Sequence, residues 1–84
     1  MKSLKTAVSD KTIDLSGQRC PNLVLGIIKA LAEMENGRIL QIIATDINAP
    51  SNIAAWSRQA NHQLIDVYEE NSKFIFYLRK NSSP

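Results

Sequence analysis

The sequence contains a single cysteine, Cys20, and a single histidine, His62. One cysteine cannot close a disulfide within the chain, and a dithiol redox site needs two. One cysteine with one histidine also falls short of the roughly four ligands that a structural zinc ion takes. These absences exclude a disulfide scaffold and a dithiol redox centre within the chain, and no metal is expected.

Long apolar runs and glycine-rich motifs are absent as well. No stretch approaches the roughly 20 apolar residues of a membrane span, and residues 1–11 lack the apolar core of a signal peptide. The three glycines form neither a Gly-x-Gly-x-x-Gly motif nor a phosphate-binding loop, so no nucleotide is expected. We therefore expect a cytoplasmic protein with no membrane partner and no cofactor.

The charged residues are dispersed along the chain. Ten Lys and Arg face eight Asp and Glu, and no basic run exceeds the pair Arg79-Lys80. Dispersion of this kind is typical of a solvated surface, so nucleic acid is not an expected partner. A chain of 84 residues with 44% hydrophobic residues predicts one domain with one modest core. We assign this domain to residues 12–80, with flexible segments at 1–11 and 81–84.

Hydrophobic periodicity predicts an alternation of strands and helices. Strands are predicted at residues 12–15, 38–44, 63–69 and 73–79, and helices at 21–35 and 50–61. Segment 38–44 is almost continuously apolar, which favours a central strand. The order predicts an α/β fold of βαβαββ type. We expect a mixed four-stranded sheet with two helices packed on one face, in which the last two strands form an antiparallel hairpin.

Apolar spacing also predicts which helix faces turn inward. In the first helix the predicted buried stripe consists of Val24, Ile27, Ile28 and Leu31. Gly26 interrupts this stripe at a cost of about 1 kcal/mol relative to alanine, and it would let the helix approach the sheet closely. Asn36-Gly37 is expected to end the helix. In the second helix the predicted inner face consists of Ile53, Trp56, Ser57 and Ala60.

Cys20 is followed by Pro21 at the predicted start of the first helix. Proline is favoured at the first helical position, so Cys20 is expected at or next to the N-cap. There the unpaired backbone N–H groups and the positive end of the helix dipole lower the pKa of a thiol, and Arg19 adds a positive charge. A buried cysteine acting as a small hydrophobic residue is the structural alternative, but polar neighbours such as Gln18 and Asn22 argue against it.

A thiol without catalytic partners can still carry sulfur. A cysteine protease needs a general base, and the only histidine, His62, falls at the far end of the second predicted helix. An exposed thiol of low pKa needs no base or metal to take up sulfane sulfur as a persulfide and to surrender it to another thiol. The residues therefore favour a persulfide relay over a self-contained turnover enzyme.

Residues 13–21, Ile-Asp-Leu-Ser-Gly-Gln-Arg-Cys-Pro, resemble the opening strand, glycine turn and Cys-Pro pair of the TusA/SirA family of small sulfur-carrier proteins. Residues 42–46, Ile-Ile-Ala-Thr-Asp, are similar to the second strand of the family and its acidic end. His62 falls where the family often has a histidine before the third strand. The similarity covers residues 12–80 without an evident gap, and Cys-Pro after Leu-x-Gly-x-x is its most specific part.

The resemblance implies a two-layer α/β sandwich with strand order 1-2-4-3, in which Cys20 carries sulfane sulfur. It implies a cysteine desulfurase or a rhodanese-type protein as the sulfur donor and a cysteine-bearing protein as the acceptor. The sulfur relays of the family serve tRNA thiouridine synthesis, molybdenum cofactor synthesis or sulfur oxidation. We expect a monomer.

Four further residues are expected to support the site. Arg19 would favour the thiolate or persulfide anion by its charge. Pro21 would set the start of the helix, and Gly17 would permit the tight turn before it. Asp46, at the end of the neighbouring strand, is expected to border the site, although the same position suits a plain helix-start residue.

The chain departs from the family pattern at Leu23, which replaces the second proline of Cys-Pro-x-Pro. Leu23 regains an N–H in the first turn, and its side chain is expected to alter the surface beside Cys20 and hence the choice of partner. In the family a proline often follows the acidic pair. The segment 47–50, Ile-Asn-Ala-Pro, lacks a proline at that place, because its only proline stands at its end.

Two other functions remain open at this point. One is a non-catalytic protein-binding or regulatory module of sulfur or selenium metabolism, for which Cys20 would be dispensable. The other is a weak RNA-binding domain, because small βαβαββ sheets can bind RNA through a basic, aromatic-bearing face. Tyr77 and Arg79 on one side of the last strand supply only a weak version of such a face.

Overall fold

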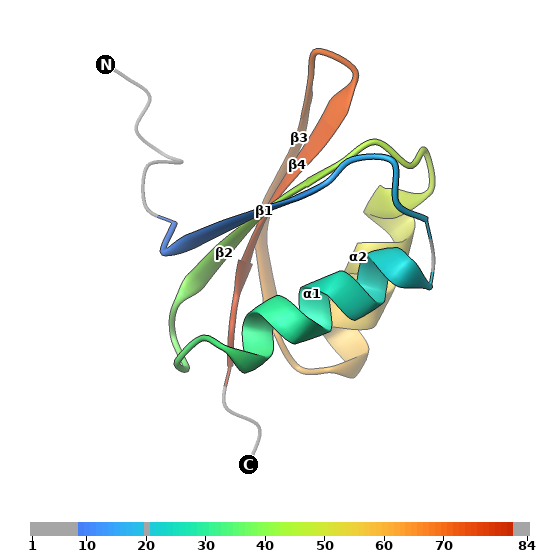
Figure 1. Ribbon diagram of the computed structural model, residues 1–84. Coiled ribbons are helices and arrows are strands. Elements are labelled where there is room, and N and C mark those ends of the chain that lie inside the picture. Colours follow the sequence, from blue (N-terminus) through green and yellow to red (C-terminus); the bar gives the residue numbers. More distant parts are fainter. Residues whose placement is uncertain (1–8, 20, 82–84) are drawn as a thin grey trace, which may run out of the picture.

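The computed structural model describes residues 9–19 and 21–81 (Figure 1). The expected flexibility of residues 1–8 and 82–84 concerns residues outside this description. The elements follow one another as β1 (Lys11–Leu15), α1 (Asn22–Ala32), β2 (Ile39–Ala44), α2 (Ala49–Gln59), β3 (Gln63–Glu70) and β4 (Lys73–Arg79). The bounds of β4 are those predicted, and the other bounds differ by three residues or fewer. Because β1 begins at Lys11, strand pairing starts inside the segment assigned to the N-terminal tail.

The four strands form one mixed sheet in the order β1-β2-β4-β3. β1 pairs with β2 in parallel, whereas β4 runs antiparallel to both β2 and β3. Both helices lie on the same side of the sheet (Figure 1). The predicted βαβαββ sandwich and the 1-2-4-3 order implied by the family resemblance are therefore confirmed.

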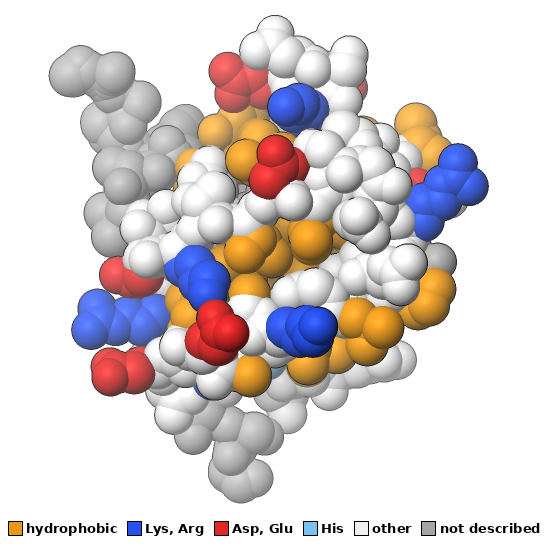
Figure 2. All heavy atoms as spheres, in the orientation of Figure 1, with side chains coloured by type: hydrophobic (Ala, Val, Ile, Leu, Met, Phe, Trp, Pro, Cys, Tyr) orange, Lys and Arg blue, Asp and Glu red, His pale blue; other side chains and the backbone are white. Residues whose placement is uncertain are grey.

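The core lies between the sheet and the helix layer. In β2 the side chains of Leu40, Ile42 and Ala44 are fully buried, and the three residues that alternate with them are half-buried on the opposite face. Each fully buried large aliphatic side chain contributes roughly 1.5–3 kcal/mol. The other fully buried large side chains are Leu23, Ile27, Ile53, Phe76 and Leu78. Figure 2 shows hydrophobic side chains gathered in the middle of one face, with charged side chains around them.

The buried face of helix α1 includes Ile27 and Leu31 of the predicted stripe but is rotated away from its other two residues. Its buried residues are Leu23, Ile27, Ala30 and Leu31. Ile28, expected in the buried stripe, is 43% exposed, and Val24 is only half-buried. Apolar residues occupy almost every angular position between residues 23 and 31, so the periodicity does not fix the rotation of this helix.

The C-terminal end of α1 is capped by a lysine that is distant in the sequence. Nζ of Lys80 donates to the carbonyl oxygens of Leu31 at 2.6 Å and Met34 at 2.7 Å, at the end of the helix where carbonyl groups lack their regular helical partners. The N–H groups of Glu33 and Met34 bond three residues back, which tightens the last turn. The regular helix consequently ends at Ala32, before the predicted stop at Asn36-Gly37.

Helix α2 follows its prediction closely. Ile53 and Ser57 are buried together with Ala49, and the side chain of Trp56 packs against the core cluster. The expectation that Trp56 belongs to the core is therefore confirmed. Both helices have 11 residues, and within the described part of the chain no helix is long and apolar enough to cross a membrane.

Gly26 is the point of closest approach between α1 and β1. A Cβ atom built on Gly26 would lie 2.9 Å from Cδ2 of Leu15, closer than side-chain atoms normally pack. The glycine therefore allows the helix to rest on the strand, as its position in the apolar stripe suggested. Leu15 in turn packs against the core from β1.

We predict that Gly26→Val lowers the free energy of unfolding by about 1–3 kcal/mol, because its branched side chain must displace Leu15. Gly26→Ala should cost much less, since one methyl group can be met by rotation of Leu15 and alanine favours the helix by about 1 kcal/mol. Urea unfolding of both variants measures the difference. In a Leu15→Ala background the difference in unfolding free energy between Gly26→Val and Gly26→Ala should shrink. An equal gap in both backgrounds would contradict the contact.

Candidate functional site

Cys20 lies outside the described residues, but the loop on either side of it is described. After β1 the chain turns sharply, with the N–H of Gln18 donating to the carbonyl oxygen of Leu15 at 3.0 Å. Gly17 has a φ of +84°, a value that favours glycine, at the position where the sequence predicted a tight turn. This turn leads the chain from the end of β1 toward α1.

Side chains hold the same turn from two sides. Oδ1 of Asp14 accepts hydrogen bonds from Oγ of Ser16 at 2.6 Å and from its N–H at 3.0 Å, and these bonds lower the pKa of the Asp14 carboxyl. The N–H of Gly17 donates to Oγ1 of Thr45 at 2.8 Å. Thr45 follows β2 directly, so this bond ties the loop after β1 to the loop after β2.

Pro21 occupies the N-cap of α1, one position before the first helical residue where it was expected. The carbonyl oxygen of Arg19 accepts from the N–H of Leu23 at 2.8 Å, and that of Pro21 accepts from Leu25 at 3.0 Å. The chain therefore enters the helical pattern at Arg19, so the residues on both sides of Cys20 are fixed by the first turn of α1.

Leu23 corrects an expectation about the surface. Its side chain is fully buried in the core, so it does not alter the surface beside Cys20, and the predicted effect on partner choice through that side chain is wrong. What this residue contributes near the site is its N–H, which bonds Arg19. A proline at position 23 could not donate this hydrogen bond.

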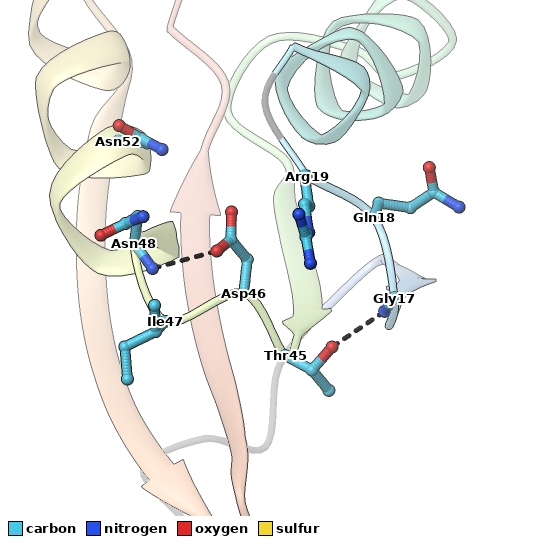
Figure 3. Close-up of a pocket in the computed structure, with 8 residues that line it drawn as sticks. All are labelled: Gly17, Gln18, Arg19, Thr45, Asp46, Ile47, Asn48 and Asn52. Carbon is cyan, nitrogen blue, oxygen red and sulfur yellow. Dashed lines mark hydrogen bonds between the residues drawn. The ribbon is translucent and has the colours of Figure 1, made fainter.

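A cavity of about 560 Å³ opens between the two loops (Figure 3). It is lined by Gly17, Gln18, Arg19, Thr45, Asp46, Ile47, Asn48 and Asn52. The cavity follows from the parallel pairing of β1 and β2, which places Leu15 opposite Ala44 and brings both following loops to one edge of the sheet. Ligands commonly bind at this edge of open α/β sheets. Of the predicted site residues, Gly17, Arg19 and Asp46 meet here.

Asp46 has two structural roles at this edge. Its Oδ1 accepts the N–H of Asn48 at 3.2 Å, and its carbonyl oxygen accepts that of Ala49 at 2.9 Å, so it shapes the start of α2. It is half-buried and also lines the cavity. The two expectations for Asp46, a helix-start residue and a site residue, are thus compatible.

Residue-by-residue reasoning missed Asn48 and Asn52 as parts of this cavity. Both project from the first turns of α2 (Figure 3). A polar segment after a buried strand signals a loop, and Asn48 could have been found in that way. Asn52 carries no such signal, because only the rotation of α2 about its axis brings it to the cavity.

His62 lies at the opposite end of the sheet. Its Nδ1 accepts the N–H of Asn81 at 3.2 Å, and the chain at Lys80 pairs with Arg38 just before β2 begins, whereas the cavity lies beyond the end of β2. The ring packs beside Trp56, with centroids 5.4 Å apart. Burial, and secondarily the charge of Lys80, lower the pKa of His62. His62 is therefore not placed to act as a base at this cavity.

The RNA-binding alternative finds little support. Tyr77, the aromatic residue considered for RNA stacking, is only 6% exposed, and its hydroxyl accepts a hydrogen bond from Gln41 at 3.1 Å. Its ring is therefore not available to stack on a base. Within residues 9–19 and 21–81, no three His, Cys, Asp or Glu side chains gather as metal ligands would.

Comparison with known proteins identifies the relatives of this chain. Residues 11–80 match the family described as Sulfurtransferase TusA. The chain is 36% identical over 72 residues to the putative sulfur carrier protein YrkI of Bacillus subtilis, covering 86% of this chain and 96% of the relative. It is 35% identical to the sulfur carrier protein TusA of Allochromatium vinosum, covering 86% and 95%. The fold matches the crystal structure of a SirA-like protein from Desulfitobacterium hafniense with a TM-score of 0.73 at 24% identity, covering 86% and 99%.

We predict that Thr45→Val loosens the loop after β1, because the N–H of Gly17 loses its acceptor. Removal of one such hydrogen bond costs about 1 kcal/mol. Amide hydrogen exchange at Gly17 should accelerate, while exchange at Leu40 in the core strand should change only as far as global stability does. Thr45→Ser keeps the hydroxyl and serves as the matched control. Equal exchange at Gly17 in the two variants would contradict the role of this bond.

The lowered pKa of His62 predicts a pH dependence of stability. In the folded state this pKa lies below its ordinary value of 6.5, so the unfolded chain binds the proton more readily. The stability contributed by neutral His62 is complete at pH values above its pKa in the unfolded chain. It is lost as the pH falls through its pKa in the folded state. The free energy of unfolding should thus decline as the pH falls below about 7.5, and His62→Gln should flatten that decline. An unchanged slope in His62→Gln would assign the decline to other groups.

Proposed function

Because the chain belongs to the TusA sulfurtransferase family, we propose that it is a sulfur carrier whose Cys20 accepts sulfane sulfur as a persulfide and passes it to an acceptor protein. The observation that carries the proposal is the position of Cys20 in the sequence. This only cysteine stands between Arg19, which lines the cavity, and Pro21, which caps α1.

The transfer needs only thiol chemistry. The Cys20 thiolate attacks the outer sulfur of a donor persulfide, a new S–S bond forms, and the donor leaves as a thiolate when its own S–S bond breaks. In the second half, a thiolate of the acceptor attacks the outer sulfur on Cys20 in the same way, and Cys20 leaves as the thiolate. No electrons are gained or lost overall, and no metal or organic cofactor enters either step.

The supporting residues act on the anion and on its position. Arg19, the residue directly before Cys20, carries a positive charge. A nearby cation favours a thiolate or persulfide anion over its neutral form. Pro21 sets the start of α1, where the positive end of the helix dipole lies. Gly17 permits the turn that Thr45 holds, and Asp46 bounds the opposite wall of the cavity. With His62 at the other end of the sheet, we assign no general base.

The proposed partners are a donor protein, such as a cysteine desulfurase or a rhodanese-type protein, and a cysteine-bearing acceptor. We place the relay in the cytoplasm, in tRNA thiolation, molybdenum cofactor synthesis or sulfur oxidation. A non-catalytic binding module remains the alternative of a different class, and the two differ in whether the Cys20 thiol is required. The RNA-binding alternative loses its main aromatic residue, since Tyr77 is buried.

We predict that incubation with a cysteine desulfurase and L-cysteine adds one sulfur, about 32 Da, to the protein. Intact mass spectrometry measures the gain, and a reductant should reverse it. Cys20→Ser and Cys20→Ala, both without a thiol, should show no gain while unfolding at urea concentrations close to that of the wild type. If desulfurase, rhodanese with thiosulfate, and polysulfide all fail to add sulfur to a thiol that still reacts with iodoacetamide, the carrier function is wrong.

A further inference from the structure

The cavity between the loops after β1 and β2 has opposite charges on its two walls. Arg19 comes from the loop after β1 and Asp46 from the loop after β2, and both side chains extend into the space between these loops (Figure 3). Among the described residues neither side chain takes part in an ion pair. The cavity thus presents one cation and one anion whose charges face the space between them.

Amide side chains complete the wall on the side of Asp46. Asn48 and Asn52 lie four residues apart, which places them on the same face of the chain at the start of α2. The side chain of Asn48 makes no capping hydrogen bond at this helix, although it stands at the N-cap. Each amide offers both a donor and an acceptor, so this wall can bond an ammonium group as well as a carboxylate.

The shape and charge of this cavity fit a small zwitterion. Arg19 matches an α-carboxylate, and Asp46 with the two amides matches an α-ammonium group. The volume of about 560 Å³ lies within the roughly 300–1,000 Å³ typical of small-molecule sites. Arg19 directly precedes Cys20 in the chain, and consecutive Cα atoms are about 3.8 Å apart. A ligand held by Arg19 is therefore bound by the immediate chain neighbour of the carrier cysteine.

We propose that this cavity binds a free α-amino acid thiol of the cysteine type, and that its persulfide loads Cys20 directly. The proposal rests on the carrier function proposed above and adds a substrate class to it. In the step, the Cys20 thiolate attacks the outer sulfur of the amino acid persulfide. The S–S bond of the persulfide breaks, the amino acid leaves as its thiolate, and one sulfur atom has moved without oxidation or reduction overall.

The competing occupant is a cysteine within a partner protein. Such a residue has neither a free ammonium group nor a free carboxylate, because both are consumed in peptide bonds. A protein loop would therefore not use the two opposed charges together. This difference in chemistry decides between the two occupants and shapes the test.

Binding can be tested without sulfur transfer by nuclear magnetic resonance titration with S-methyl-L-cysteine, which has no transferable sulfur. Shifts are expected at the amides of Gly17 and of residues 45–48. Two matched ligands lack one charge each: 3-(methylthio)propanoate has no ammonium group, and 2-(methylthio)ethylamine has no carboxylate. Each should bind up to about fivefold more weakly, which is the upper effect of a partly exposed ion pair.

Variants separate the cavity from the general charge of the protein. Asp46→Asn keeps an oxygen that can accept the N–H of Asn48 but removes the negative charge, and Arg19→Gln removes the positive charge. Each substitution should lower the affinity for S-methyl-L-cysteine by about fivefold. The matched controls, Asp66→Asn and Arg58→Gln, alter charges outside the cavity and should leave the affinity unchanged. Equal affinity for all three ligands, or equal effects of cavity and control variants, would overturn the proposal.

Loading rates then connect binding with transfer. Mass spectrometry follows the gain of sulfur from cysteine persulfide and from inorganic polysulfide, which has neither an ammonium group nor a carboxylate. The ratio of the two rates should fall about fivefold in Asp46→Asn but not in Asp66→Asn. If polysulfide loads Cys20 while this ratio is the same in both variants, the amino acid site is wrong and the carrier function stands. If no donor loads Cys20, the carrier function itself fails, whatever the titration shows.

Discussion

The arrangement of this domain depends on the parallel pairing of β1 with β2. The register places Leu15 opposite Ala44, so the two strands end together and both following loops leave from the same edge of the sheet. The hydrogen bond from Gly17 to Thr45 then joins these loops. As a result Arg19 and Asp46, which are far apart in the sequence, line one cavity.

Helix α1 carries the second constraint, because the loop that leads into it lines the same cavity. The helix is fixed along its length by buried Leu23 in the first turn, by the contact of Gly26 with Leu15, and by Lys80 at its C-terminal carbonyls. The N–H of Leu23 binds Arg19 as well, so the core and the loop before the helix are connected through one residue. The family difference at this position therefore acts on the backbone of the loop and not on its surface.

The chemistry of the site is consistent with the residues that the fold keeps away from it. His62, the only histidine, is held at the far end of the sheet by Asn81 and Trp56, in surroundings that favour its neutral form. The groups at the cavity include a guanidinium, a carboxylate and amides, which can bind and orient a ligand. Such a set suits sulfur exchange between thiols, in which the nucleophile and the leaving group are both thiolates.

Much of the fold could be read from the sequence because strand patterns repeat every two residues and turns have distinctive residues. The alternation of Phe74, Phe76 and Leu78 predicts both ends of β4 as the structure has them. Gly17 predicts the tight turn in which its positive φ is found. Cys20 likewise stands out in the sequence alone, as the only cysteine and directly before a proline that favours a helix start. The tertiary structure decided the buried face of α1 and the membership of Asn52 in the cavity. Apolar residues surround α1 on most sides, so only packing against Leu15 and the sheet selects its rotation. Asn52 lines the same cavity as Arg19 only because the rotation of α2 about its axis turns it there.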